Sequence, residues 1–132
     1  MSLRSLLART LLLSVSLGGC SPATEFTATP WQTSTNGEWL TRVARFDTVG
    51  PGNNSLYETV ELKRSATNKG VAILTLDEGS ELPDRLKGPP VITLRWRDPS
   101  HLAIAYRAGT VIHQIVKADH VFVETSRSDT LR

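Results

Sequence analysis

From Gly37 onward, the apolar residues of this chain come in short segments separated by Gly, Pro and Asn residues. No window of helical length keeps an apolar stripe at positions i, i+3, i+4 and i+7, which argues against helices. Short apolar runs between turn residues are typical of strands. The predicted strands are Glu38 to Asp47, Leu56 to Arg64, Val71 to Leu76, Val91 to Arg97, His101 to Arg107, Val111 to Lys117 and Val121 to Thr125.

Tight reversals are expected at residues 68–70, 98–100 and 108–110, where Gly, Pro, Asn and Asp cluster. Such short connections predict antiparallel neighbours. We therefore expect one small all-β domain of about seven short strands, either an antiparallel sandwich or a curled, partly closed sheet. The pattern does not distinguish these architectures.

The best-defined unit is the predicted hairpin from Val91 to Arg107. Alternation places its larger apolar side chains on one face and its charged side chains on the other. The predicted core face carries Ile92, Leu94 and Trp96 on the first strand and Leu102, Ile104 and Tyr106 on the second.

The opposite face of this hairpin carries Arg95, Arg97 and Arg107, which we call the arginine face. Guanidinium groups form bidentate contacts with phosphate or carboxylate, so the arginine face is a candidate site for an anionic partner. The alternative is that Glu and Asp residues of neighbouring strands pair with these arginines and that the face only provides solubility.

The N-terminus has the order of a bacterial signal peptide. Residues 1–9 carry two arginines and no acid, and residues 10–17 are mostly apolar. The run Leu17, Gly18, Gly19 and Cys20 that follows resembles the lipobox of bacterial lipoproteins. The resemblance implies cleavage before Cys20 and acyl chains on its thiol and new N-terminus. The alternative is an ordinary secretory signal that happens to contain a cysteine.

We accordingly expect residues 1–19 to be a lipoprotein signal peptide. In lipoproteins of bacteria with two membranes, the residue after the cysteine biases sorting, and Ser21 favours the outer membrane, facing the periplasm. Residues 20–36, rich in Ser, Thr and Pro, predict an acylated N-terminus and a flexible tether, with Trp31 packed on the domain. Residues 37–126 are the expected domain, and residues 127–132 a flexible C-terminal tail.

Charge and cysteine content narrow the function classes. The chain has 15 Lys and Arg residues against 13 Asp and Glu residues, and removal of Arg4 and Arg9 with the signal peptide leaves the charge balanced. Nucleic acid is therefore not an expected partner, because phosphate binding needs an excess of basic residues. The one cysteine, Cys20, leaves no intrachain disulfide, so the domain depends on hydrophobic burial.

The hairpin also resembles a loosely defined group of small bacterial exported proteins. The resemblance rests on a V/I-x-L-x-W strand, a polar turn and an L-x-I-x-Y strand near the C-terminus, preceded by a strand like residues 59–62. It covers roughly Leu56 to Glu124. It implies an exported all-β domain and carries no activity.

Candidate metal sites find little support in the sequence. His101, His113 and His120 lie on different predicted strands or turns, without the close spacing of known metal ligands. The long predicted loop from Asp77 to Pro90 has four carboxylates, but their spacing is not that of a calcium loop. We expect no metal and no cofactor.

Catalytic constellations are not visible either. There is no G-x-S-x-G motif, and the spacing of Glu58 and Glu61 places them on opposite faces of a strand, which does not suit a shared carboxylate site. We expect no enzyme. The expected function is a non-catalytic, membrane-anchored envelope lipoprotein that acts as a binding or assembly module for an envelope protein or an anionic envelope polymer. The alternative is an inhibitor or immunity lipoprotein against an enzyme or toxin that acts in the periplasm.

Overall fold

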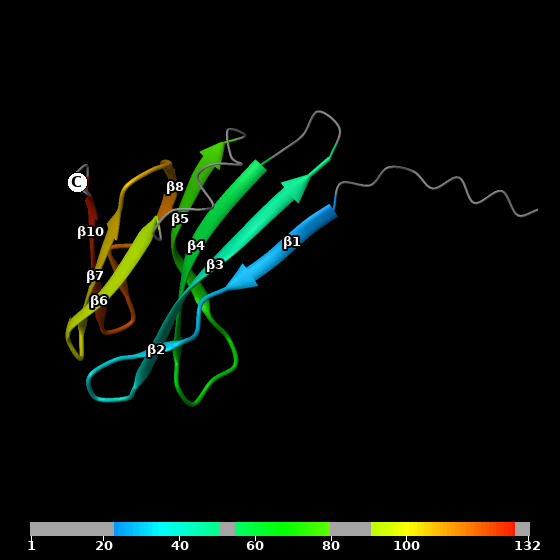
Figure 1. Cartoon of the computed structure of the whole chain (residues 1–132). Coiled ribbons are helices and arrows are strands. Elements are labelled where there is room, and N and C mark those ends of the chain that lie inside the picture. The colour runs from blue at the N-terminus through cyan, green and yellow to red at the C-terminus, as the bar shows by residue number, and fades with distance from the viewer. Residues whose placement is uncertain (1–22, 51–54, 80–90, 129–132) are drawn as a thin grey trace, which may run out of the picture.

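The computed structural model describes residues 23–50, 55–79 and 91–128, and these ranges form ten strands and no helix (Figure 1). The predicted all-β class is confirmed. Among these residues there is accordingly no helix that could cross a membrane.

The strands form two sheets. The first sheet has the order β1-β3-β4-β5-β8, with β2 also paired to β3, and the second has the order β6-β7-β10-β9. The first sheet consists of β1 (Ala23–Ala28), β2 (Gln32–Thr33), β3 (Trp39–Val49), β4 (Ser55–Arg64), β5 (Val71–Gly79) and β8 (Thr110–Gln114). The second consists of β6 (Ile92–Asp98), β7 (His101–Tyr106), β9 (Lys117–Ala118) and β10 (Val121–Arg127).

All strand pairs are antiparallel except one, since β10 runs parallel to β7. The expectation of antiparallel neighbours holds for strands joined by short reversals. It does not hold for this pair, because the chain leaves β7, joins the edge of the first sheet as β8 and only then returns to the second sheet as β9 and β10.

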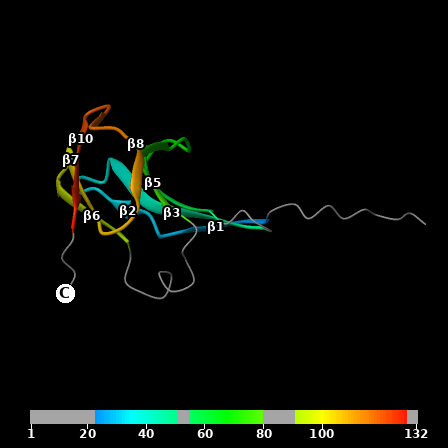
Figure 2. The same cartoon turned by 90° about the horizontal axis from the view of Figure 1, so that it is seen from above.

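The core lies between the two sheets, which face each other (Figure 2). The predicted faces of the hairpin are confirmed, because Ile92, Leu102 and Ile104 are buried, while Leu94, Trp96 and Tyr106 pack against the core. The buried core residues are Trp39, Val60, Leu62, Ile73, Leu74, Leu76, Val91, Ile92, Leu102, Ile104, Val121 and Val123.

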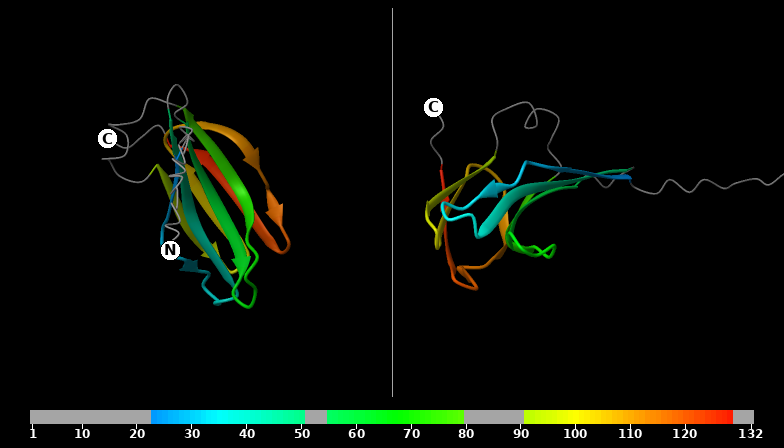
Figure 3. Two further views of the ribbon diagram at one scale, coloured as in Figure 1. Left: turned by 90° about the vertical axis from the view of Figure 1, so that its right-hand side faces the viewer. Right: turned by 90° about the horizontal axis from the view of Figure 1, so that it is seen from below.

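The far ends of β1, β3 and β4 project beyond the second sheet (Figure 3).

The two sheets are joined at one corner by a bend in the chain. The predicted single strand from Val111 to Lys117 is instead two strands, β8 on β5 and β9 on β10. The backbone N–H of Ile115 donates to Ile73 (2.9 Å), and the carbonyl of Val116 accepts from Val123 (2.9 Å), so the chain changes sheet between these two residues. The described strands do not close into a barrel.

The prediction of a flexible tether is wrong for residues 23–33. The whole of β1 pairs with β3, from Ala23 opposite Val49 to Ala28 opposite Ala44, and β2 continues along the same edge of β3. The Ser, Thr and Pro content of this segment suggests a linker, and its residues show no sustained alternation that would predict the pairing. Trp31 packs on the domain as predicted. The expected signal peptide and Cys20 lie outside the described residues. The expected flexible tail from residue 127 begins too early, because β10 includes Arg127 and the Ser128 N–H donates to the Tyr106 carbonyl (2.7 Å); residues 129–132 lie outside the described part of the chain.

The predicted loop from Asp77 to Pro90 begins later than expected. Strand β5 continues to Gly79, where the backbone turns through a left-handed conformation (φ 71°) and its N–H donates to the Asp77 carboxylate (2.8 Å). Residues 80–90 lie outside the described part of the chain.

Candidate functional site

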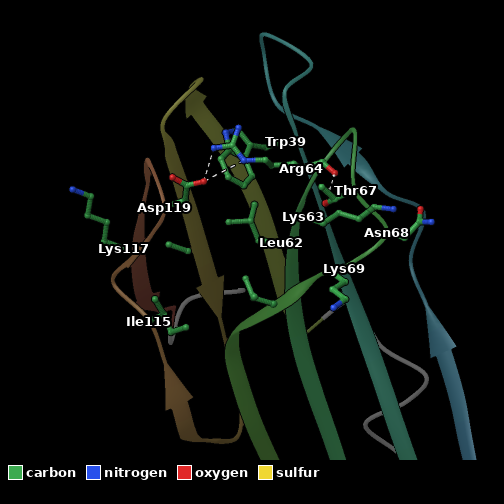
Figure 4. A pocket seen from close by; sticks show the side chains of 12 residues that line it. Trp39, Leu62, Lys63, Arg64, Thr67, Asn68, Lys69, Ile115, Lys117 and Asp119 are labelled. Carbon is green, nitrogen blue, oxygen red and sulfur yellow. Dashed lines mark hydrogen bonds and ion pairs between the residues drawn. The ribbon is translucent and has the colours of Figure 1, made fainter.

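A cavity of about 540 Å³ opens where β3 begins and β4 ends, beside the bend that leads to the second sheet (Figure 4). This volume lies within the range of small-molecule sites, about 300–1,000 Å³. We call this cavity the end pocket. Its lining residues are Trp39, Leu62, Lys63, Arg64, Thr67, Asn68, Lys69, Val71, Ile115, Lys117, Ala118 and Asp119.

The floor of the end pocket is apolar. Trp39 and Leu62 are buried and belong to the core, and Ile115 approaches from the bend between the sheets. The turn before β3 positions the backbone of Trp39, because the Ser34 hydroxyl accepts from the backbone N–H of Trp39 (3.0 Å) and Gly37 takes the left-handed conformation (φ 76°) that the turn requires.

Arg64 ties the two sides of the end pocket together. Its guanidinium carbon lies 4.7 Å from the centroid of the Trp39 ring, a cation–π contact. Its Nε and Nη2 donate to one carboxylate oxygen of Asp119 (3.2 and 2.5 Å), and its Nη1 donates to Glu38 (3.2 Å). The guanidinium therefore links the end of β4, the start of β3 and the turn before β10 (Figure 4).

The Arg64 and Asp119 pair shifts both groups toward their charged forms. Hydrogen bonding from Arg64 holds the pKa of Asp119 below its usual 3.8, and the same bond raises the pKa of Arg64. Asp119 also has a left-handed backbone (φ 55°), which Asp tolerates better than most residues. A carboxylate so held is a poor proton acceptor at neutral pH.

The rim of the end pocket is cationic. Four basic side chains line it, and the carboxylates of Asp119 and Glu38 both pair with Arg64, which leaves a formal excess of two positive charges. The Lys63 ammonium lies 4.6 Å from the Trp31 ring centroid, and that of Lys117 lies 4.8 Å from the Phe122 ring centroid. Lys69 is exposed and forms no ion pair or hydrogen bond within the described ranges.

This combination suits a ligand with one apolar part and one anionic part. The apolar part would displace water from the indole and aliphatic floor, and the anionic part would meet the basic rim. The lining includes no His and no Cys, its one carboxylate is paired, and the Thr67 hydroxyl donates to the Arg64 carbonyl (3.3 Å).

The arginine face is a strip rather than a cluster. Arg95 and Arg97 lie on the exposed outer face of β6, and Arg107 is half-buried just beyond the end of β7. Arg95 stands opposite Ala103, four residues before Arg107, which places their backbones about 13 Å apart along the strand. Arg97 forms an ion pair with Glu124 of β10 (2.7 Å), so the predicted alternative of local pairing holds for this residue.

A second, smaller cavity of about 340 Å³ adjoins Arg97. Beside it, the His101 ring stacks on Phe122 (5.2 Å between centroids), and its Nδ1–H donates to the Asp98 carboxylate (2.8 Å). This hydrogen bond, with one from the Ser100 N–H, lowers the pKa of Asp98 below 3.8. The polar side chains that border this cavity therefore already form hydrogen bonds or ion pairs with one another.

The three histidines do not meet. Besides the contacts of His101, His113 donates from Nε2 to the Ala72 carbonyl (3.0 Å), and His120 is exposed beside Asp119. In the ranges that the structure describes, no three His, Cys, Asp or Glu side chains lie close enough to hold a metal ion.

Glu58 and Glu61 lie on opposite faces of β4, as predicted. Glu58 points toward the inner side and pairs with Arg45, while Glu61 lies on the outer side and pairs with Arg42 (2.7 Å). Each carboxylate therefore has its own cation, and the two do not form a shared site.

No protein-family model, curated protein or solved structure matches the chain, so its function is inferred from its residues and its fold. The residues of the end pocket were not singled out in the sequence. Arg64 and Asp119, which meet there, are 55 positions apart. The weak local signals were the basic residues around the turn at 65–70 and the polar turn at 119–120.

Proposed function

We propose that the protein is a non-catalytic lipoprotein of the bacterial envelope, anchored by acyl chains on Cys20, that binds an anionic amphiphile in its end pocket. The observation that carries the binding proposal is the apolar floor of Trp39, Leu62 and Ile115 beneath a rim with two excess positive charges. A fatty acid or a lipid with a negatively charged headgroup has this chemistry.

The anchor is supported by the lipobox resemblance at Leu17 to Cys20. Each buried methylene contributes about 0.8 kcal/mol to membrane binding, so two or three acyl chains on one cysteine would hold the protein firmly. With Ser21 after the cysteine, the proposed location is the outer membrane, on its periplasmic side.

Binding is tested with a matched pair of ligands, decanoate and decyltrimethylammonium, which share an alkyl chain and differ in charge. We measure binding by calorimetry on the detergent-solubilised full chain, below the critical micelle concentrations of both ligands. We expect decanoate to bind and decyltrimethylammonium not to bind. Lys69→Glu should weaken decanoate binding about tenfold, because it reverses one charge at the rim. The control is Arg95→Glu, the same reversal on an exposed strand outside the end pocket, which should leave affinity unchanged.

Equal binding of both ligands would contradict the anionic preference, and failure of both to bind would remove the end pocket as the ligand site. Equal losses in Lys69→Glu and Arg95→Glu would show that the net charge of the protein, and not the rim, attracts the anion.

The anchor is tested separately by growing cells with radiolabelled palmitate. The wild-type protein should take up label and fractionate with the outer membrane, whereas Cys20→Ala should take up none and stay soluble or uncleaved. A wild-type protein without label would remove both the lipidation and the proposed location.

A further inference from the structure

The outer face of the first sheet carries a row of aromatic side chains. Phe26 of β1, Phe46 of β3 and Tyr57 of β4 occupy directly opposite positions on three neighbouring strands. The Phe26 and Phe46 ring centroids lie 5.1 Å apart, and Phe26 is 50% exposed, so this apolar row is open to the surroundings.

Two cations and a tryptophan extend the row. The Arg42 guanidinium carbon lies 4.4 Å from the Trp31 ring centroid and 5.6 Å from that of Phe26, and the Lys63 ammonium lies 4.6 Å from the Trp31 ring centroid. Arg42 pairs with Glu61, which leaves one net positive charge. We call the surface formed by Phe26, Trp31, Arg42, Phe46, Tyr57 and Lys63 the aromatic face.

The aromatic face begins close to the proposed anchor. Only Ser21 and Pro22 separate Cys20 from Ala23, the first residue of β1. An extended residue spans at most about 3.6 Å, so an acylated Cys20 would lie within about 11 Å of the sheet. Because β1 is paired to β3 along its whole length, there is no long spacer to lift the domain from the lipid.

We propose that the aromatic face docks on the surface of the lipid bilayer in which Cys20 is anchored. Trp and Tyr rings, here Trp31 and Tyr57, concentrate at the level of lipid headgroups, the apolar ring of Phe26 would be buried among the lipids, and the net positive charge is complementary to anionic lipids. The inference rests on acylation of Cys20, since the short link to β1 is what brings this face to the membrane.

Docking in this way would also place the end pocket beside the lipid. Lys63 lies over Trp31 on the aromatic face and also lines the end pocket. An anionic amphiphile leaving the bilayer would therefore reach the cationic rim without crossing the water layer.

The experiment uses the acylated full chain, with acylation of Cys20 verified by mass spectrometry, in vesicles of three parts phosphatidylethanolamine to one part phosphatidylglycerol. Phospholipids brominated on their acyl chains quench nearby tryptophan. We expect them to quench wild-type emission and to lose most of that effect in Trp31→Phe, because the indoles of Trp39 and Trp96 belong to the interior.

The deciding variant is Phe26→Ser, which removes the most exposed ring and should shift the ratio of docked to undocked protein about tenfold toward undocked. Its matched control is Ile112→Ser on β8, which removes an apolar side chain that is 57% exposed and lies outside the aromatic face. Circular dichroism melting checks that both variants fold.

The outcomes separate the two proposals. Absence of acyl chains on Cys20 would remove the anchor and, with it, the docking proposal. Acylated protein whose Trp31 is not quenched, or equal effects of Phe26→Ser and Ile112→Ser, would overturn docking and leave the anchor intact. A change from dimer to monomer in detergent on Phe26→Ser would also overturn it, because a second copy would then cover the aromatic face.

Discussion

The two sheets hold their arginines in different ways. In the first sheet, Arg42 and Arg45 of β3 stand directly opposite Glu61 and Glu58 of β4, and both form ion pairs. The first of these pairs lies on the outer face and the second on the inner face of the sheet. Here the register of the strands supplies each arginine with a carboxylate.

In the second sheet, Arg95 of β6 stands opposite Ala103, and Arg97 reaches past β7 to pair with Glu124 of β10. Both members of that pair are mostly exposed, 57% and 63%. The comparison shows that the residue directly opposite on the next strand decides whether an arginine forms an ion pair there. Strand register determines which residue stands opposite, and this cannot be read from the number of charged residues in the chain.

The largest expected effect comes from the inner pair of the first sheet. The Glu58 side chain is only 4% exposed, its Oε1 accepts from Arg45, and its Oε2 has no partner within the described residues. Arg45→Met would leave this carboxylate buried without its cation, so we expect a loss of about 3–5 kcal/mol in the free energy of unfolding, measured by urea titration. Arg97→Met removes an exposed ion pair, so it should lower the free energy of unfolding by less than about 1 kcal/mol. Similar losses in both variants would erase the contrast between the sheets.

The next largest effect is expected on the inner face of the second sheet, which packs against the core on the side opposite to the exposed arginines. Trp96 packs against the core, and its indole N–H is buried with no acceptor among the described residues. Trp96→Ala should cost about 3 kcal/mol. Trp96→Phe should cost less than about 1 kcal/mol, because it keeps much of the ring volume and removes an unpaired donor. A large loss in Trp96→Phe would mean that the N–H has a partner in solution.

A smaller, pH-dependent effect is expected at the end pocket. The folded-state pKa of Asp119 lies below 3.8, chiefly because Arg64 donates to it. The pair therefore stabilises the fold fully above pH 3.8, and this contribution is lost as the pH falls through the folded-state pKa. The melting temperature of the wild type should exceed that of Asp119→Asn by a constant margin at neutral pH, and the margin should shrink below about pH 4.

The control for this pH profile is His120→Asn. His120 is the weakest of the causes that lower the pKa of Asp119, so its removal should leave the profile in place. A profile that depends on His120 more than on Arg64 would contradict the proposed origin of the shift.

These expectations differ in how much of them could be read from the sequence. The hairpin from Ile92 to Tyr106 was predictable, because its alternation is local and its two strands are neighbours along the chain. Strand β1 was not, because β2 and a turn separate it from its partner β3, and its Ser- and Thr-rich surroundings are typical of linkers. The division of residues 110–118 between two sheets depends on where β5 and β10 lie, which alternation does not encode.

The candidate functional surfaces follow the same rule. The arginine face came from alternation within one hairpin and was therefore visible. The end pocket and the aromatic face are assembled from segments that pair only in the folded sheet, such as Phe26 with Phe46 or Arg64 with Asp119. No local motif marks their residues in the sequence, so only the pairing of the strands shows that these residues lie side by side.

The smallest effect on stability is expected for the arginine face itself, where Arg95, Arg97 and Arg107 are all changed to Ala. We expect a loss of about 1 kcal/mol, because Arg95 and Arg97 are exposed and exposed pairs contribute little, so that most of the loss comes from the half-buried Arg107. If the arginine face binds an anionic envelope polymer, the triple variant should recover less of it in a pull-down, and added salt should weaken wild-type binding, since charges are screened beyond about 8 Å. Arg95→Ala alone should then account for most of the loss, because Arg95 has no carboxylate partner in the described ranges, whereas Arg97 is held by Glu124. Equal recovery by the wild type and the triple variant would remove the arginine face as a binding site and leave the end pocket and the aromatic face as the surfaces to examine.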